Sequence, residues 1–354
     1  MRILLPCLLG AGALWSADAA RAADAAAAIP ESALASWHAQ IASTAKPGIG
    51  CFSATYPSLA WQREVCDEPA QIPFGHPAIL TQTRNGHTTI QAESSGGSGL
   101  TVGNGADYAA QSAGITKTAV GSFPTVSGVT VTAYDYSLQL NTNITASSPA
   151  CAADGYSSCY VWQQFIYVTT YYPTSGGSQG PHAFIQNWFF ADSSDFNSLG
   201  CPSGFEDSGY SYTFNGGSYE GCFGNSSAVS APKVPATSLA SAKLTGASVA
   251  NGKDTVTFTY SNKAYTVTQS DNTLDIASVW KQSEFNIVGD GGGSAATFNK
   301  GSSLTVKIAL TDGTTTAPTC LSNAGTTGET NNLTLGKCTA SGGSTPSISF
   351  TESR

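Results

Sequence analysis

Charged residues are scarce in this chain. Lysine, arginine, aspartate and glutamate make up 11% of its 354 residues, and 15 basic against 23 acidic side chains give a formal net charge of −8 at pH 7. Typical domains carry about 25% charged residues. Nucleic acid and anionic membranes both need clustered lysine and arginine, so we expect neither as a partner. So sparse a set of charges also gains little self-repulsion when carboxylates are protonated, which favours tolerance of acid.

Several familiar catalytic signatures are also missing. The sequence has no Gly-x-Ser-x-Gly elbow, no His-Glu-x-x-His pair and no phosphate-binding glycine-rich loop. Its four histidines are scattered and form no ligand pattern. Asp207-Ser208-Gly209 resembles half of an aspartic-peptidase site, but that chemistry needs two carboxylates that share a proton, and no second copy exists. We therefore expect no metal and no cofactor.

Long hydrophobic runs are absent as well. No segment has the roughly 18 apolar residues that a transmembrane helix requires. Residues 1–23 instead show the order of an export signal, with Arg2, an apolar run that ends at Trp15, and small residues before the expected cleavage site. We predict a signal peptide and secretion to the periplasm or the extracellular space. A lipoprotein anchored at Cys7 is disfavoured, because the apolar region follows that cysteine instead of preceding it.

Eight cysteines follow the predicted signal peptide, and an even number in an exported chain indicates disulfides. Zinc is disfavoured because no Cys-x-x-Cys occurs. The only methionine is the initiator, which also suits oxidising surroundings. The cysteines form four couples that are close in sequence, and we predict the pairs Cys51–Cys66, Cys151–Cys159, Cys201–Cys222 and Cys320–Cys338.

The pattern of hydrophobic residues predicts an all-β fold. From residue 100 onward, short runs rich in Val, Thr, Tyr, Phe and Ile alternate between two faces and are separated by Gly, Ser, Asn and Pro clusters. No alternation of strands with helices is visible, which disfavours an α/β fold. We predict a two-sheet antiparallel β-sandwich, of the concanavalin-like or jelly-roll type, over residues 95–354.

The region before the predicted sandwich has a different sequence pattern. A helix is expected over residues 30–43, where Leu34, Trp37 and Ile41 recur at helical spacing. A Ser/Gly-rich run over residues 94–99 is either a linker or a long hairpin turn. We interpret residues 24–94 as an N-terminal segment that serves as a propeptide and shields the functional face.

Two predicted strands carry polar side chains in otherwise apolar runs. Gln163 and Gln164 are neighbours in one of them, so one points inward and the other outward. In the other strand Glu284 shares a face with Asn286, while Phe285 points to the core. A carboxylate held among amides can have the shifted pKa that general acid–base catalysis uses. An ordinary solvated strand would show the same pattern.

The order of the segments resembles the eqolisins, the glutamic peptidases, whose catalytic Gln and Glu lie on strands of a β-sandwich. The chain is identified as a divergent, bacterial-type member over roughly residues 103–310. Six segments carry the resemblance, and in chain order they are Asn104-Gly105-Ala106-Asp107-Tyr108, residues 121–128, Tyr136-Ser137-Leu138-Gln139-Leu140-Asn141, Val161-Trp162-Gln163, Gln186-Asn187-Trp188-Phe189 and Ser283-Glu284-Phe285-Asn286-Ile287-Val288.

The sequence departs from the family pattern at several positions. The Thr-Gly that follows the catalytic glutamine is Gln164-Phe165 here, and the family's strand Asp is Asn141. The acidic residue of its aromatic run is Asn187. Either Gln163 or Gln164 could therefore be the counterpart of the catalytic glutamine.

The resemblance implies a secreted, acid-acting endopeptidase that works on polypeptides as a monomer. Glu284 would be the general base that activates water, and Gln163 would orient the water and stabilise the oxyanion. Five further residues are implied in substrate binding, although a core role fits either tryptophan equally well; they are Trp188, Trp280, Asn286, Asn141 and Gln186. The alternative function is a non-catalytic or carbohydrate-binding β-sandwich, since sheets lined with Trp, Tyr, Asn and Gln also suit sugars.

Overall fold

The computed structural model describes residues 29–71, 82–84, 87–91, 107–130, 132–133, 135–291, 294–322 and 329–354. The predicted signal peptide and the Ser/Gly-rich run at 94–99 lie outside these residues. None of the helices in the described ranges is long and apolar enough to cross a membrane.

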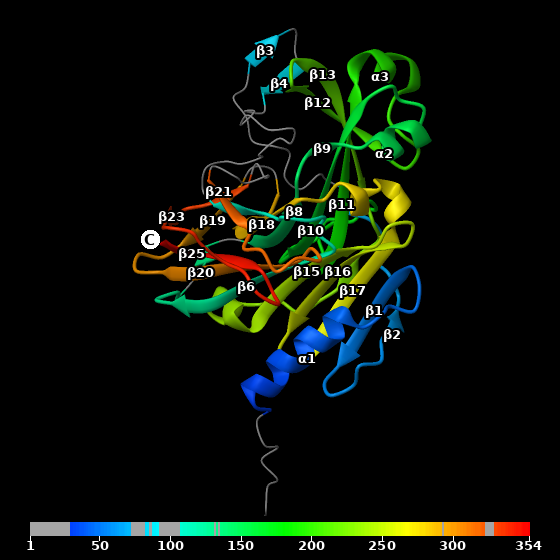
Figure 1. The fold of residues 1–354 in the computed structure, drawn as a ribbon. Helices are drawn as coiled ribbons and strands as arrows, with labels where there is room; N and C mark the ends of the chain where they lie inside the picture. Colours follow the sequence, from blue (N-terminus) through cyan, green and yellow to red (C-terminus); the bar gives the residue numbers. More distant parts are fainter. Residues whose placement is uncertain are drawn as a thin grey trace, which may run out of the picture.

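Two large, mainly antiparallel sheets pack face to face, which confirms the predicted β-sandwich (Figure 1). In spatial order, the first sheet consists of β2 (Gln62–Glu64), β1 (Gly50–Thr55), β17 (Lys263–Ser270), β16 (Lys253–Tyr260), β15 (Ala242–Ser248), β6 (Thr118–Ser127), β20 (Ser303–Thr311), β25 (Ser347–Ser353) and β23 (Thr334–Leu335), with β24 (Thr339–Ser341) also paired to β25.

The second sheet holds the strands that carry the predicted catalytic residues. In spatial order it consists of β21 (Thr319–Ser322), β5 (Tyr108–Gln111), β18 (Gln282–Gly289), β8 (Tyr136–Thr142), β10 (Cys159–Val168), β11 (His182–Asp192), β13 (Gly217–Asn225), β12 (Glu206–Phe214), β4 (His87–Gln91) and β3 (Gln82–Arg84), with β14 (Val229–Ser230) on β11 and β9 (Thr145–Ala146) on β10. A small third sheet is made of β22 (Thr330–Asn331), β19 (Ala295–Phe298) and β7 (Thr132–Ala133).

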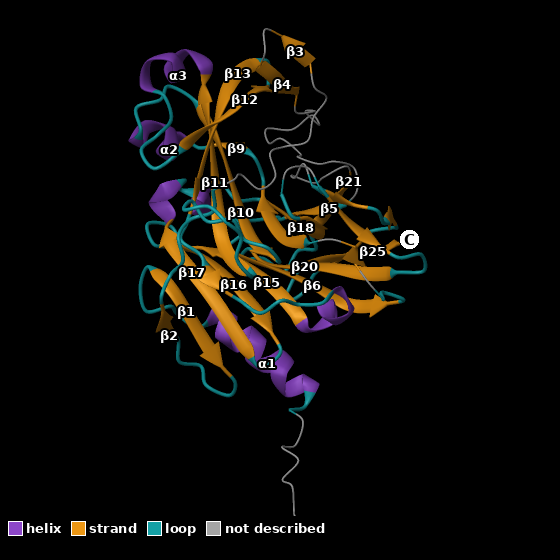
Figure 2. Cartoon of the chain, turned by 180° about the vertical axis from the view of Figure 1, so that it is seen from behind, coloured by secondary structure: helices purple, strands orange, loops and turns teal. Residues whose placement is uncertain are grey.

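The predicted helix is α1 (Glu31–Ser43), which lies along the outer side of the first sheet (Figure 2). Trp37 and Ile41 are its buried apolar residues, and they pack against Ala54 and Ala264. Two shorter α-helices that the sequence did not indicate are α2 (Ser148–Ala153) and α3 (Ser193–Leu199). Single 3₁₀ turns occur at residues 236–241, 271–273 and 276–278.

The N-terminal segment is part of the sandwich. Strand β1 pairs with β17 along its whole length, from Gly50 opposite Thr268 to Thr55 opposite Lys263. The segment interpreted as a propeptide thus supplies β1 and the edge strand β2, which extend the first sheet.

All four predicted disulfides are present, and their Cα–Cα separations run from 5.3 to 6.2 Å. Each one closes a loop of 8 to 21 residues. They join β1, the start of β10, β13 and β21 to segments that are close in sequence, and Cys320–Cys338 also links the second sheet to the segment between β23 and β24 of the first.

Aromatic rings fill the space between the sheets by packing over glycine. The ring of Phe285 on β18 lies on Gly121 of β6, so a Cβ atom at that glycine would stand 2.1 Å from it. Phe165 on β10 covers Gly246 of β15 in the same way, at 2.3 Å. These contacts confirm that Phe285 points to the core and fix the opposite face of β18 as the one that carries Glu284.

We expect Gly121→Ala to lower the free energy of unfolding by about 1–3 kcal/mol, because the added methyl must displace a closely packed ring. Gly180→Ala is the matched control, since nothing lies within 4 Å of a Cβ atom at that exposed glycine. Urea denaturation of both variants tests the packing. Equal stability of the two would contradict it.

Candidate functional site

Five polar side chains form one row across the second sheet. The strand register places Glu284 opposite Asn141, Asn141 opposite Gln164, Gln164 opposite Gln186 and Gln186 opposite Asn225. Directly opposed residues of antiparallel strands point to the same face. We call these five residues, on β18, β8, β10, β11 and β13, the polar row.

Hydrogen bonds run along the polar row. The amide of Asn141 donates from Nδ2 to Oε2 of Glu284 at 3.2 Å, and Gln186 donates to Oδ1 of Asn225 at 2.8 Å. The indole of Trp188 donates to the side-chain oxygens of Gln164, at 3.0 Å, and Gln186, at 3.1 Å. The bonds thus form two groups, one of Asn141 with Glu284 and the other of Gln164, Gln186 and Asn225 joined through Trp188.

Gln164, and not Gln163, shares the face of Glu284. Gln163 points between the sheets, where its Nε2 donates to Oδ1 of Asn187 at 3.0 Å and to Oδ2 of Asp254, on the opposite sheet, at 2.7 Å. Gln164 donates from Nε2 to Oε1 of Gln139 at 3.1 Å. The structure thus separates the predicted partners Gln163 and Glu284 onto opposite faces.

The two tryptophans predicted at the substrate groove are both fully buried. Trp280 packs on Phe165 between the sheets and donates from its indole nitrogen to the carbonyl oxygen of Gln282 at 2.8 Å. Trp188 lies on the face of the polar row and stacks on Trp162. Trp188 therefore fixes the amides of the row, and Trp280 belongs to the core.

Asn286, two residues after Glu284 on the same face of β18, binds two further buried carboxyl groups. Its Nδ2 donates to Oε1 of Glu352 at 2.8 Å and to Oδ2 of Asp107 at 3.3 Å. Asp107 precedes β5, in which Ala109 is opposite Glu284. Glu352 comes from β25 and also accepts from Asn331 at 3.3 Å. We call Asp107, Glu284 and Glu352 the carboxyl cluster.

The environment of the cluster favours protonated carboxyl groups. Burial raises the pKa of Asp107 well above its usual value, and the negative charge of Glu284, a hydrogen bond to Glu284 and the charge of Glu352 add to this, against the amide of Asn286. Burial also raises the pKa of Glu352 to about 7, although Asn286 and Asn331 donate to it. The cluster therefore holds protons well above the pH at which exposed carboxyl groups lose theirs.

Sequence reasoning did not assign a role to Asp107 or Glu352. The burial of Glu352 could have been predicted, because Glu352 follows Ile348 and Phe350 at alternate positions on the inward face of its strand. Asp107 stands in coil just before a four-residue strand, where periodicity does not indicate a face.

Another buried carboxyl group lies between the sheets. Asp254 accepts from Ser248 Oγ at 2.5 Å as well as from Gln163, and Ser248 also lies 3.0 Å from Oδ1 of Asp271. Burial raises the pKa of Asp254 to about 7, and the charge of Asp271 adds to this against the hydrogen bonds from Ser248, Gln163 and Gln269.

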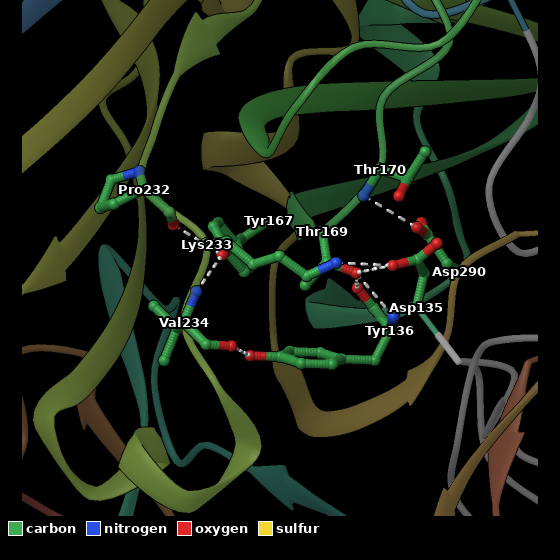
Figure 3. Close-up of polar contacts among 9 residues, drawn as sticks. All are labelled: Asp135, Tyr136, Tyr167, Thr169, Thr170, Pro232, Lys233, Val234 and Asp290. Atoms are coloured by element: carbon green, nitrogen blue, oxygen red, sulfur yellow. Dashed lines mark hydrogen bonds and ion pairs between the residues drawn. The ribbon is translucent and has the colours of Figure 1, made fainter. Parts of the chain in front are cut away.

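A third group of carboxyls lies at the opposite end of β8 and β18 (Figure 3). Asp290 accepts from the backbone N–H of Thr170 at 3.0 Å, and burial raises its pKa to about 8. Asp135, which pairs with Lys233 at 2.9 Å, adds to that rise through its charge. Asp135 and Asp290 line a cavity of about 480 Å³ together with Tyr172.

No group of three or more His, Cys, Asp or Glu side chains that could hold a metal ion occurs in the described ranges. Comparison of the chain with protein-family models, curated proteins and solved structures finds no match. The resemblance to the eqolisins therefore rests on the ordered sequence segments alone.

The raised pKa values predict a protein that is most stable in acid. Asp107, Glu352, Asp254 and Asp290 keep protons in the folded state that an unfolded chain releases near pH 4. Their stabilising contribution is complete below about pH 4 and is lost as the pH rises from about 4 through the folded-state values near 7 and 8. We expect the thermal midpoint to fall steadily over this interval.

Asp254→Asn tests the same linkage at one position. An amide at position 254 can still accept from Gln163, and it can donate to Ser248, which then donates to Asp271. The variant should equal the wild type at pH 4 and exceed it at pH 8 by up to about 4 kcal/mol, since one pKa unit corresponds to about 1.4 kcal/mol. Denaturant unfolding at both pH values, with the exposed Asp207→Asn as control, measures the difference. A wild type that is as stable at pH 8 as at pH 4 would contradict the linkage.

Proposed function

We propose that the protein is a secreted, acid-acting endopeptidase with Glu284 and Gln164 as its catalytic pair. The observation that carries the proposal is the polar row, in which both side chains lie on one face of the second sheet on strands separated only by β8. The proposal keeps Glu284 from the family resemblance and replaces Gln163 by its neighbour. Export is supported by the four disulfides, which form in oxidising compartments.

The roles follow from the chemistry of the two groups. An ionised Glu284 takes a proton from a water molecule, whose oxygen attacks the scissile carbonyl carbon. The amide oxygen of Gln164 accepts from the indole of Trp188, and one N–H of its amide nitrogen donates to Gln139. The second N–H of that nitrogen is the one that can donate to the developing oxyanion. Asn141 orients the Glu284 carboxylate through its 3.2 Å hydrogen bond.

The N-terminal segment is proposed to keep the enzyme latent. Glu284 exposes only 3% of its surface, so the substrate needs an opening of this face. Ala70 packs against Ile166 and Phe184, which share the face of the polar row, and its carbonyl oxygen accepts from Asn225 at the end of that row.

A hydrogen bond between two side chains holds the same N-terminal stretch in place. Nε2 of His182 on β11 lies 2.8 Å from Oδ2 of Asp67. Release or processing of the segment in acid would uncover the polar row, so activity should appear together with cleavage of the chain.

The carbohydrate-binding alternative gains no support from the aromatic residues. Among the tryptophans in the described ranges, Trp37, Trp162, Trp188 and Trp280 expose at most 4% of their surface. Trp61 is half-buried, and Nζ of Lys46 lies over its ring, 5.2 Å from the centroid. A sugar-stacking platform needs an exposed ring face, so we do not propose this function.

Glu284→Gln should abolish most of the peptidase activity, with kcat lower by about 10²–10⁴-fold, because the amide cannot accept a proton from water. The matched control is Glu206→Gln, which removes a carboxylate from an exposed position of β12. Digestion of a denatured protein at acidic pH, with pepstatin present and after acid processing, provides the assay. Wild-type activity in Glu284→Gln would refute the mechanism.

The two glutamines should differ in what they affect. Gln164→Ala is expected to lower kcat by about 10²–10³-fold through loss of an oxyanion donor. Gln163→Ala removes one of the hydrogen-bond donors to Asp254 and to Asn187 in the core, so it should lower the thermal midpoint while the folded fraction keeps its kcat. The opposite assignment of losses would show that Gln163 is the catalytic amide.

A further inference from the structure

Asp107 and Glu284 form a buried pair of carboxyl groups. They expose 1% and 3% of their surfaces, respectively. Ala109 is opposite Glu284, and Asp107, two residues before Ala109 and just before β5, accepts from Asn286, two residues after Glu284 on the same face of β18. The pair thus sits on the face of the polar row, at the end where Glu284 lies.

The hydrogen bonds to this pair come from neutral amides: Asp107 accepts from Asn286, and Glu284 accepts from Asn141. Two adjacent carboxylates in a buried site cannot both remain ionised, so one of them holds a proton.

The contacts indicate which oxygen carries this proton. Oδ2 of Asp107 accepts from Asn286, whereas Oδ1 is buried and accepts from no N–H or hydroxyl group in the described ranges. Glu284 already accepts at Oε2 from Asn141, which favours its ionised form. The hydrogen bond between the two carboxyl groups raises the pKa of Asp107, as expected if Asp107 is the donor and Glu284 the acceptor.

We propose that Asp107 is the general acid of the reaction and shares its proton with Glu284, the general base. The inference rests on the proposed peptidase function and adds a second catalytic carboxyl group to it. The site would then combine an oxyanion-binding glutamine with an acid–base pair of carboxyl groups.

Peptide hydrolysis then needs one proton transfer to Glu284 and one from Asp107. Glu284 removes one proton from water, the hydroxyl oxygen bonds to the carbonyl carbon, and the π electron pair moves to the oxygen that Gln164 stabilises. When this oxyanion re-forms the double bond, the carbon–nitrogen bond breaks and Asp107 gives its proton to the departing nitrogen. The products are a carboxylic acid and an amine, and the proton on Glu284 passes to Asp107 to restore the pair.

Asp107→Asn separates proton transfer from hydrogen bonding. The amide can still donate to Glu284 and accept from Asn286, so the variant should fold, but it has no proton to transfer. We expect kcat for peptides to fall by about 10²–10⁴-fold with KM unchanged. Asp107→Glu should recover part of this loss. The control Asp207→Asn, at an exposed position, should have no effect.

An ester substrate with an acidic alcohol as leaving group distinguishes the two carboxyl groups. Its leaving group needs no proton, so Asp107→Asn should cleave it at nearly the wild-type rate, whereas Glu284→Gln should lose both activities. Peptide hydrolysis at the wild-type rate in Asp107→Asn would overturn the role of Asp107 and leave the proposed peptidase function intact. Equal loss on peptide and ester would also overturn it.

The shared proton has a readout that does not depend on activity. In a ¹³C NMR titration of labelled aspartate carboxyl carbons, Glu284→Gln should lower the pKa of Asp107, because it removes the neighbouring charge and the acceptor. An unchanged titration would overturn the pairing. If the wild type hydrolyses no peptide after acid processing, the peptidase function and the catalytic role of Asp107 both fail, and this titration still decides whether the two groups share a proton.

Discussion

The burial of carboxyl groups among amide and hydroxyl groups is the constraint on which the rest of this structure depends. Asp107 and Glu352 accept from one amide, that of Asn286, and Glu284 accepts from Asn141. Asp254 lies between the sheets among hydroxyl and amide groups. Such groups can stay buried only if most of them are neutral. The fold therefore favours acid, where protons are available to neutralise them.

Neutral amides take the place that basic residues fill in most buried acidic sites. Asn141, Asn286 and Asn331 donate hydrogen bonds whose strength does not depend on titration of the donor. A salt bridge loses its negative partner at low pH, whereas an amide also accepts a hydrogen bond from a protonated carboxyl group. The four disulfides and the low content of lysine and arginine also suit a protein that must stay folded in acid.

Much of the architecture could be predicted from the sequence, because it depends on local patterns. The spacing of the cysteines indicated all four disulfides, helical periodicity located α1, and two-residue alternation indicated the sandwich and the orientation of Phe285. The choice between Gln163 and Gln164 could not be made in this way. Strand β10 is buried on both faces almost throughout, so its hydrophobic pattern does not distinguish inside from outside, and only the pairing with β8 and β18 does.

The carboxyl cluster could not be predicted from local sequence patterns either. Its members lie far apart in the chain, before β5, in β18 and in β25, and only the topology brings them together. A neutron diffraction structure at acidic pH would test the central claim most directly. The account predicts one proton between the carboxyl groups of Asp107 and Glu284, bound to Asp107, with Gln164 on the same face of the sheet. Two ionised carboxylates without a shared proton, or Gln163 on the face of Glu284, would contradict it.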